Sequence, residues 1–414
     1  MSQRHPWALL VAAFTIIGAS GYACGSGSPA DGGGGDGGDV AMGGDGPGGH
    51  GAQGGNDGGH AGDGGMGGDG GMGGEDCLPP SQSDLPNPVV DYAPGVTVTT
   101  LAGSGSSGTA DGTGALAQFD NPVNLLLDAS LDLAVADFEN GTIRRVTSSG
   151  VVTTPFAGTT GFGRPFGLAF GMGDNLFVQT DENTLGNNGP DDGSLWRVDL
   201  GAGSATLLLQ NVGRPRGLAF TGSALILSDV KHHALRSLNV STQDLSLVAG
   251  RWDCPGFADG PAEQARFYVP YDVTLAANGD RIVVDAGNHS IRRITPSGVV
   301  STIAGTGQPG MVDGSLAVAQ FHGPRGVAID AAGIIYVSDV DNRRIRRIDV
   351  AADRVDTLAG NGIPGYADGA GSTAQFFGME GIDVLPDGSV VYVADGNEGQ
   401  GDPPYHRVRV VTLP

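Results

Sequence analysis

The stretch "GPRGVAIDAAGIIYVSDVDNRRIRRI" (residues 323–348) holds three short apolar segments separated by turn residues. The segments "GVAI", "IIYVSD" and "RIRRI" are rich in β-branched residues, and Gly, Pro, Asp and Asn stand between them. Runs of this kind, bounded by turn residues, predict β-strands. Apolar residues do not recur at helical spacing here. The stretch therefore predicts a small antiparallel sheet.

The same pattern recurs six times between Val96 and Pro414. The other copies of its second half are "LAVADFENGTIRRV" (133–146), "NLFVQTDENTLGNNGPDDGSLWRV" (175–198), "ALILSDVKHHALRSL" (224–238), "RIVVDAGNHSIRRI" (281–294) and "VVYVADGNEGQGDPPYHRVRVV" (390–411). A strand introduced by Pro or Gly precedes each copy, and a short strand ending near Ala-Gly follows most of them. Four short strands per repeat are typical of propeller blades, so the sequence predicts an all-β fold, a six-bladed β-propeller.

The last copy lacks its fourth strand, while "VTVTTLAG" (96–103) has no partners of its own. We expect this N-terminal strand to complete the C-terminal blade, because closing the ring protects sheet edges that would otherwise be exposed.

These residues resemble NHL repeats, whose hallmark is a strand, an Asp-x-x-Asn turn and an Ile-Arg strand. "DAGNHSIRRI" (285–294) and "DVDNRRIRRI" (339–348) carry this hallmark, and the resemblance spans residues 96–414. Adjacent strand residues face opposite sides of a sheet. We therefore expect one arginine of each third-strand pair to lie between blades and the other to meet solvent. Arg343 and Arg344, in the turn, have no counterpart in most blades.

The N-terminal part of the chain has a different composition. Residues 1–23 combine a basic start with the apolar run "ALLVAAFTIIGA" (8–19), which indicates a signal peptide. The segment "SGYAC" resembles the end of a bacterial lipoprotein signal, which would make Cys24 the lipidation site; an ordinary secretory signal cleaved near Ala23 is the alternative. Residues 24–77 are rich in Gly and Asp and have no apolar period, so we expect a disordered tether. The propeller is then residues 78–414, lipid-anchored at the cell envelope or otherwise secreted.

Cysteine content and charge limit the possible partners. With Cys24 set aside, Cys77 and Cys254 remain as an even pair, and export makes a disulfide between them plausible. The chain has a formal net charge of −23, and residues 78–414 retain −15. This charge argues against nucleic acid as a partner. We expect a monomer that contacts the membrane only through its anchor.

Two repeated features are expected to be architectural. One is an aspartate that closes the second strand and caps turn N–H groups: Asp137, Asp181, Asp229, Asp285, Asp339 and Asp395. The other is a Gly-rich loop in which Asp-Gly precedes a phenylalanine at constant spacing, which places Phe119, Phe267, Phe321 and Phe376 between blades. Repetition at four positions suits architecture better than an active site.

The blades differ at the second residue of the first strand: Val123, Phe166, Arg216, Tyr271, Arg325 and Glu380. If these residues meet at one mouth of the central channel, then Arg216, Tyr271, Arg325 and Glu380 form a candidate site for a small anionic or polar ligand. A structural ion pair between Arg216 and Glu380 is the alternative. The histidines fall at unlike repeat positions, so we expect no metal site and no cofactor.

Two classes of function fit these residues, because fold does not fix function. The first is a non-enzymatic binding module for a protein, glycan or small ligand. The alternative is a propeller-type lyase or lactonase that acts on a small molecule at the channel mouth; some NHL-like lyases hold zinc with propeller histidines. No catalytic residue can be chosen from the sequence.

Overall fold

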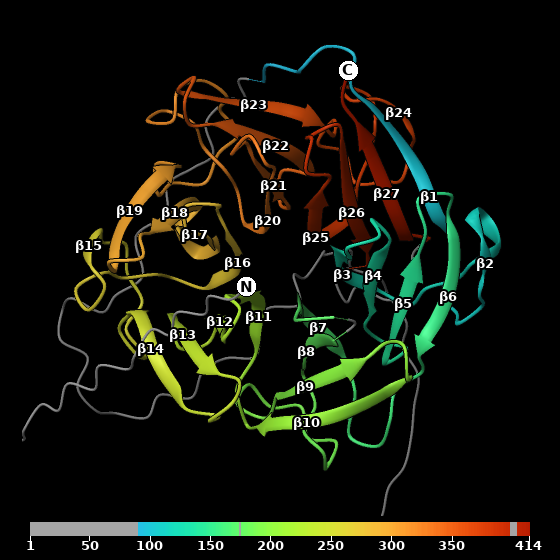
Figure 1. The fold of residues 1–414 in the computed structure, drawn as a ribbon. Helices are drawn as coiled ribbons and strands as arrows, with labels where there is room; N and C mark the ends of the chain where they lie inside the picture. The colour runs from blue at the N-terminus through green and yellow to red at the C-terminus, as the bar shows by residue number, and fades with distance from the viewer. Residues whose placement is uncertain (1–89, 174, 398–403) are drawn as a thin grey trace, which may run out of the picture. The chain divides into compact units, whose positions relative to one another are not determined.

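The computed structural model describes residues 90–173, 175–397 and 404–414, which form a ring of six antiparallel sheets (Figure 1). Each sheet is one blade, with its first strand at the centre of the ring and its fourth at the periphery. The predicted all-β, six-bladed propeller is confirmed. Among the described residues, no helix is both long and apolar enough to cross a membrane.

The strands are numbered along the chain, and the blades are numbered 1 to 6 in the same order. The inner strands are β3 (Pro122–Leu127), β7 (Pro165–Phe170), β11 (Pro215–Phe220), β16 (Pro270–Leu275), β20 (Pro324–Ile329) and β25 (Gly378–Val384). The second strands are β4 (Leu133–Asp137), β8 (Asn175–Thr180), β12 (Ala224–Asp229), β17 (Arg281–Asp285), β21 (Ile335–Asp339) and β26 (Val390–Gly396). The third strands are β5 (Thr142–Val146), β9 (Ser194–Asp199), β13 (Ala234–Asn239), β18 (Ser290–Ile294), β22 (Arg344–Asp349) and β27 (His406–Thr412). The outer strands are β6 (Val151–Phe156), β10 (Ser204–Gln210), β14 (Leu245–Gly250), β19 (Val299–Ala304), β23 (Arg354–Ala359) and, in blade 6, β1 (Thr97–Gly105).

In blade 6, β1 lies beside β27 on the outer side of the sheet, which brings the two ends of the described chain together (Figure 1). The residues just before β1 reach back to blade 5. Tyr92 forms a parallel bridge with Thr357, and its hydroxyl donates to the Gly360 carbonyl at 2.8 Å. Blades 5 and 6 are therefore linked by the N-terminal segment. The predicted signal peptide and tether lie outside the described residues.

Long Gly-rich loops lead into blades 1, 4, 5 and 6, whereas blades 2 and 3 follow short connections. Three of these loops add a two-residue strand to the outer strand of the blade that they precede: β2 (Gly112–Thr113), β15 (Gly260–Pro261) and β24 (Gly369–Ala370). In blade 5 a single bridge between Gly314 and Val355 does the same. Single 3-10 turns occur at η1 (Gly114–Leu116) and η2 (Ala286–Asn288).

The core lies between neighbouring blades. The phenylalanine that ends each long loop is fully buried, and each belongs to a different apolar cluster: Phe119, Phe267, Phe321 and Phe376. Burying one such ring contributes roughly 1.5–3 kcal/mol. The architectural role expected for these loops is confirmed.

Candidate functional site

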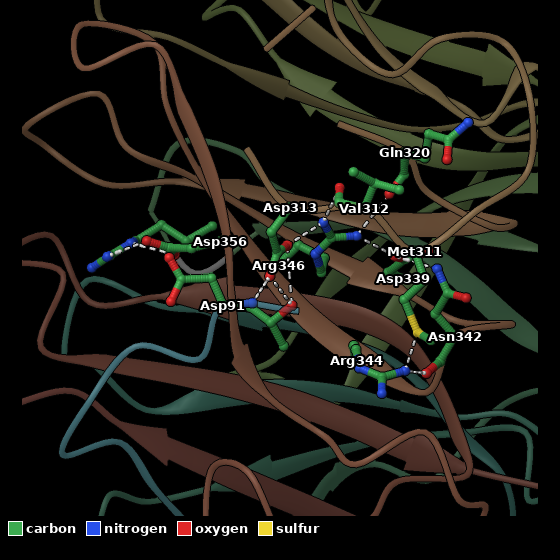
Figure 2. A network of polar contacts seen from close by, with 12 residues as sticks. Asp91, Met311, Val312, Asp313, Gln320, Asp339, Asn342, Arg344, Arg346 and Asp356 are labelled. Carbon is green, nitrogen blue, oxygen red and sulfur yellow. Dashed lines mark hydrogen bonds and ion pairs between the residues drawn. The ribbon is translucent and has the colours of Figure 1, made fainter. Parts of the chain in front are cut away.

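A buried arginine on the third strand joins each long-loop blade to the loop in front of it. In blade 5, Arg346 donates to Asp339 at 2.8 Å and to the loop residue Asp313 at 2.5 Å, as Figure 2 shows. Its guanidinium also donates to two loop carbonyls and lies 5.0 Å from the centre of the Phe321 ring. The equivalent arginines of blades 1, 4 and 6 make the same pair of carboxylate contacts and are at most 1% exposed: Arg144, Arg292 and Arg409.

The aspartate of this network has a different role from the one expected. Asp339 Oδ1 accepts the N–H of His322, which lies just before the inner strand of the same blade, at 2.7 Å. Its Oδ2 accepts from Arg346 and from Asn342, whose amide also reaches the Gly310 carbonyl at 2.7 Å (Figure 2). The carboxylate therefore ties three segments together instead of capping only its own turn. Of the six predicted turn caps, Asp229 accepts N–H groups of its own turn, from Lys231 and His232.

The remaining arginines of residues 339–348 also have structural partners. Arg347 pairs with Asp356 at 2.7 Å. Arg344 is 6% exposed and donates to the carbonyls of Asn342 and Asn361. Arg343 donates to the Phe377 carbonyl, with its guanidinium 5.0 Å from the centre of that ring. This basic stretch is part of the architecture.

Blade 2 departs from the network by one residue of register. Pro165 pairs with Thr180, whereas Pro122 of blade 1 pairs with Asp137. Thr180, not Asp181, is therefore the equivalent of the repeated aspartate, and the prediction for Asp181 was wrong. Trp196 occupies the position of the buried arginine, and its indole N–H donates to Thr180 Oγ1 at 3.1 Å. A neutral hydrogen bond replaces the ion pair in this blade.

Blade 3 keeps the ion pair but lacks the long loop. Arg236 contacts Asp229 at 2.8 Å and donates to the Val212 carbonyl. His232 occupies the position of the turn asparagine of other blades. Its Nδ1 lies 2.9 Å from Asp229 Oδ2. Its ring stacks on the Trp252 ring, with the two ring centres 3.8 Å apart.

Three histidines are equivalent, contrary to the sequence-based expectation. His233, His289 and His406 each directly precede the residue that pairs with the blade's repeated aspartate. Each accepts, at Nδ1, a backbone N–H of the following blade at 2.8–3.2 Å. The interaction requires an unprotonated Nδ1. Burial lowers the pKa of His233, and burial and His322 lower the pKa of His289 to about 4. These imidazoles join blades. Among the described residues, no group of three or more His, Cys, Asp or Glu could hold a metal ion.

The channel mouth brings the four predicted ligand residues together. The Tyr271 hydroxyl donates to Glu380 Oε1 at 3.3 Å, and Arg325 pairs with the same carboxylate. Arg216 lies with its guanidinium 4.1 Å from the centre of the Phe166 ring, and that ring is 5.9 Å from Tyr271. Burial and the nearby Glu380 raise the pKa of Tyr271, so its hydroxyl stays protonated and can donate.

The ion pairs at the mouth differ from the alternative that the sequence suggested. Arg216 does not pair with Glu380. Its two terminal nitrogens donate to Asp181 at 2.7 and 3.0 Å, and Gln179 also donates to that carboxylate at 3.1 Å. Burial lowers the pKa of Arg216, but Asp181, Tyr271 and Glu380 raise it by more, so it remains charged. Asp181 is 3% exposed and lies behind the arginine.

A cavity of about 180 Å³ opens between these residues. Its lining is Asn121, Val123, Phe138, Glu139, Phe166, Arg216, Tyr271 and Glu380. Arg325 is not part of the lining and contacts the site through Glu380. Three of the four predicted residues thus face one small, partly aromatic cavity.

Two carboxylates inside the channel were not found from the sequence. Asp272 and Asp383 project from the inner strands of blades 4 and 6, and each accepts two backbone N–H groups. Burial raises the pKa of Asp272 to about 7 and that of Asp383 to about 6. Asp272 faces Gly217 of blade 3, where a Cβ atom would lie 2.6 Å from the Asp272 Cα. Each acid occurs in a single copy, so no repeat pattern marked it.

Two predicted cysteine sites fall wholly or partly outside the described residues. Cys254 is 2% exposed in the loop before blade 4, while Cys24 and Cys77 lie outside. Lipidation of Cys24 and a Cys77–Cys254 disulfide stay predictions.

The chain is similar to known proteins in its repeats and its fold. No family model matches it. It is 35% identical over 136 residues to human "NHL repeat-containing protein 2", an alignment that covers 30% of this chain. The chain carries an NHL-repeat β-propeller.

Other comparisons place this NHL propeller among larger proteins and among bacterial structures. It is 27% identical over 290 residues to Arabidopsis thaliana "Protein SUPPRESSOR OF QUENCHING 1, chloroplastic", which is 61% of this chain. The alignments cover only 18% of the human protein and 27% of the plant protein. A structural genomics protein of unknown function from Bacteroides thetaiotaomicron superposes with a TM-score of 0.60 at 20% identity, covering 77% of this chain and 76% of that one. An auxiliary nutrient binding protein from Bacteroides ovatus superposes with a TM-score of 0.58 at 21% identity, covering 78% of each chain.

Proposed function

We propose that the NHL propeller is a binding module whose channel mouth takes a small, uncharged, hydroxyl-bearing ligand, such as the terminal sugar of a glycan. The observation that carries this proposal is the cavity lined by Phe166, Arg216, Tyr271 and Glu380. Ligand sites typically combine apolar walls with a few convergent polar groups.

The charges at the mouth are already compensated within the protein. Arg216 pairs with Asp181, Arg325 with Glu380, and Glu139 lies 3.5 Å from Arg164. A charged ligand would have to compete with one of these partners. An uncharged ligand would leave all three pairs intact, which favours it over the anion that the two arginines alone would suggest.

The polar groups that face the cavity offer both donors and acceptors. Arg216 has more N–H donors than its two bonds to Asp181 use, and Glu380 Oε2 accepts no hydrogen bond from the described residues. A hydroxyl group of the ligand can accept a hydrogen bond from Arg216 and donate one to Glu380 Oε2. Phe166 and Tyr271 supply apolar surface against which the C–H face of a sugar ring can pack. A cavity of about 180 Å³ suits one ring better than an extended chain.

The bacterial neighbours agree with a binding role. Two of them carry the name "auxiliary nutrient binding protein" at TM-scores of 0.58. Their likeness concerns the fold, and the ligand assignment for this chain rests on its own mouth residues.

Calorimetric titration of the full chain with neutral methyl hexosides tests the proposal. We expect saturable binding to the wild type and at least a tenfold loss in Glu380→Gln, because the amide no longer offers two acceptor oxygens. Glu263→Gln, which changes an exposed glutamate outside the mouth, serves as the matched control. Absence of binding for every hexoside, or equal binding by Glu380→Gln, would contradict the proposal. Conversion of a sugar lactone, added in place of the methyl hexoside, would indicate the lactonase alternative.

We also propose that the module is exported and held at the cell envelope by a lipid on Cys24. The signal-like residues 1–23 and the Gly-rich residues 24–77 support this proposal. Expression of the full chain and of Cys24→Ala with labelled palmitate is the test. Label on the wild type alone is expected, and equal labelling of the two would refute lipidation at Cys24.

A further inference from the structure

We infer that Asp181 sets the selectivity of the channel mouth for uncharged over anionic ligands. The inference rests on the proposed function for the location of the site. It assigns a specificity role to a residue that does not line the cavity and acts through Arg216.

The register of blade 2 places Asp181 where it can act. Because Thr180 takes the position of the repeated aspartate, Asp181 falls on the following position. In the other blades this position is apolar or glycine: Phe138, Val230, Ala286, Val340 and Gly396. The fold does not require a carboxylate there, and the ion-pair network of the regular blades does not use one.

The contacts of Asp181 fix both the position and the charge of Arg216. The bidentate bond uses the two terminal nitrogens, at 2.7 and 3.0 Å. Phe166 holds one face of the guanidinium, and Gln179 holds the carboxylate from behind at 3.1 Å. The side chain of Arg216 is 14% exposed, so part of it remains accessible from the cavity.

This arrangement removes the feature that would attract an anion. A guanidinium binds carboxylate best through two parallel N–H bonds, and Asp181 already occupies that edge. An incoming carboxylate would also approach Asp181 and Glu380, which both raise the pKa of Arg216 and therefore lie within electrostatic reach. An uncharged hydroxyl group does not compete with Asp181 for the bidentate edge of Arg216, and the carboxylates of Asp181 and Glu380 do not repel it. Replacing Asp181 by an uncharged residue should leave Arg216 able to bind a ligand carboxylate.

Matched neutral and anionic probes test the inference. Methyl glucoside and glucuronate would be titrated into the full chain as wild type, Asp181→Asn and Asp181→Ala. We expect at least a tenfold gain in glucuronate affinity in both variants, and no such gain when Arg216→Ala is added to either one. Asp199→Asn, which removes an exposed carboxylate from the same blade, controls for the change in overall charge and should behave as the wild type.

The outcomes separate this inference from the proposed function. If Asp181→Asn does not fold, Asp181→Ala decides, because the equivalent position of blade 4 already carries Ala286. Folded variants without a gain in glucuronate affinity would overturn the inference, as would a wild type that binds glucuronate as tightly as methyl glucoside. A wild type that binds no neutral sugar, together with variants that gain glucuronate binding, would refute the proposed function and leave the role of Asp181 intact.

Discussion

In blades 1, 4, 5 and 6 the aspartate at the end of the second strand pairs with an arginine inside the architecture, whereas the aspartate that follows the second strand of blade 2 pairs with Arg216 at the channel mouth. In these four blades a buried arginine joins two aspartates and the loop carbonyls, as Arg346 does with Asp339 and Asp313. In blades 2 and 3 the long loop is missing, and Asp181 of blade 2 holds Arg216 of blade 3 at the mouth. The same residue types therefore stabilise the blades in one part of the ring and form an ion pair at the channel mouth in another.

If the proposed function holds, the difference shows how a repeat protein can acquire a site without losing its fold. A one-residue shift and the Thr180–Trp196 pair remove the need for a buried charge in blade 2. The carboxylate of the next residue, Asp181, is then available to pair with Arg216.

Arg346→Ala should have the largest effect. Removing one partner of a buried pair leaves Asp339 and Asp313 uncompensated, which costs about 3–5 kcal/mol. Arg236→Ala in blade 3 should cost less, about 1–3 kcal/mol, because Arg236 pairs with one aspartate instead of two, and Asp229 retains His232 and two backbone N–H groups. Urea unfolding of both variants is the measurement. Equal losses of unfolding free energy in the two variants would show that the contacts of Arg346 with Asp313 and its loop do not contribute to stability.

Thr180→Asp should come next, at about 2–4 kcal/mol, because it buries a carboxylate beside a tryptophan with no cation in contact. Adding Trp196→Arg should restore part of the loss by recreating the pair of the regular blades. A double-mutant cycle on unfolding free energies measures the coupling, which we expect to be favourable by about 1–3 kcal/mol. Additive losses would contradict the assignment of Trp196 to the arginine position.

Asn342→Ala should cost about 1–2 kcal/mol, since it removes two buried hydrogen bonds, to Asp339 and to the Gly310 carbonyl. His232→Asn places the turn residue of the regular blades into blade 3, and its cost should be smaller. The comparison of thermal midpoints checks this order. A larger loss in His232→Asn would assign that histidine a role of its own.

His289 should make stability fall in acid. Its folded pKa is lowered from 6.5 to about 4, so between these values the unfolded chain binds a proton that the folded chain does not. The contribution of neutral His289 to the free energy of unfolding is therefore complete above pH 6.5 and is lost as the pH falls toward 4. His289→Asn keeps an acceptor for the Gly323 N–H and does not titrate. The wild type should lose about 1 kcal/mol more than this variant between pH 7 and pH 4.5. Parallel pH profiles of the two proteins would exclude the effect.

The sequence was sufficient for the fold because the same local signals occur in every copy. Turn residues and β-branched runs marked six blades, and Phe119 and its equivalents lie where the loop spacing placed them. The convergence of Arg216, Tyr271 and Glu380 followed from one repeat position, since equivalent residues of a ring meet at its axis.

The sequence was insufficient where pairing depends on register or on a single residue. The sequence pattern aligns Asp181 with the repeated aspartates, and only the pairing of Thr180 with Pro165 shows the shift that gives Arg216 its partner. Loops of different length likewise hid the equivalence of His289 and His406.

A crystal structure of the full chain soaked with a neutral methyl hexoside tests most directly whether the channel mouth is a binding site. We expect a sugar ring against Phe166 and Tyr271, with one hydroxyl between Arg216 and Glu380 Oε2 and the Asp181–Arg216 pair unbroken. A ring bound elsewhere, for example in the cavity of about 430 Å³ near Asp128 and Leu200, with the mouth empty, would contradict the assignment.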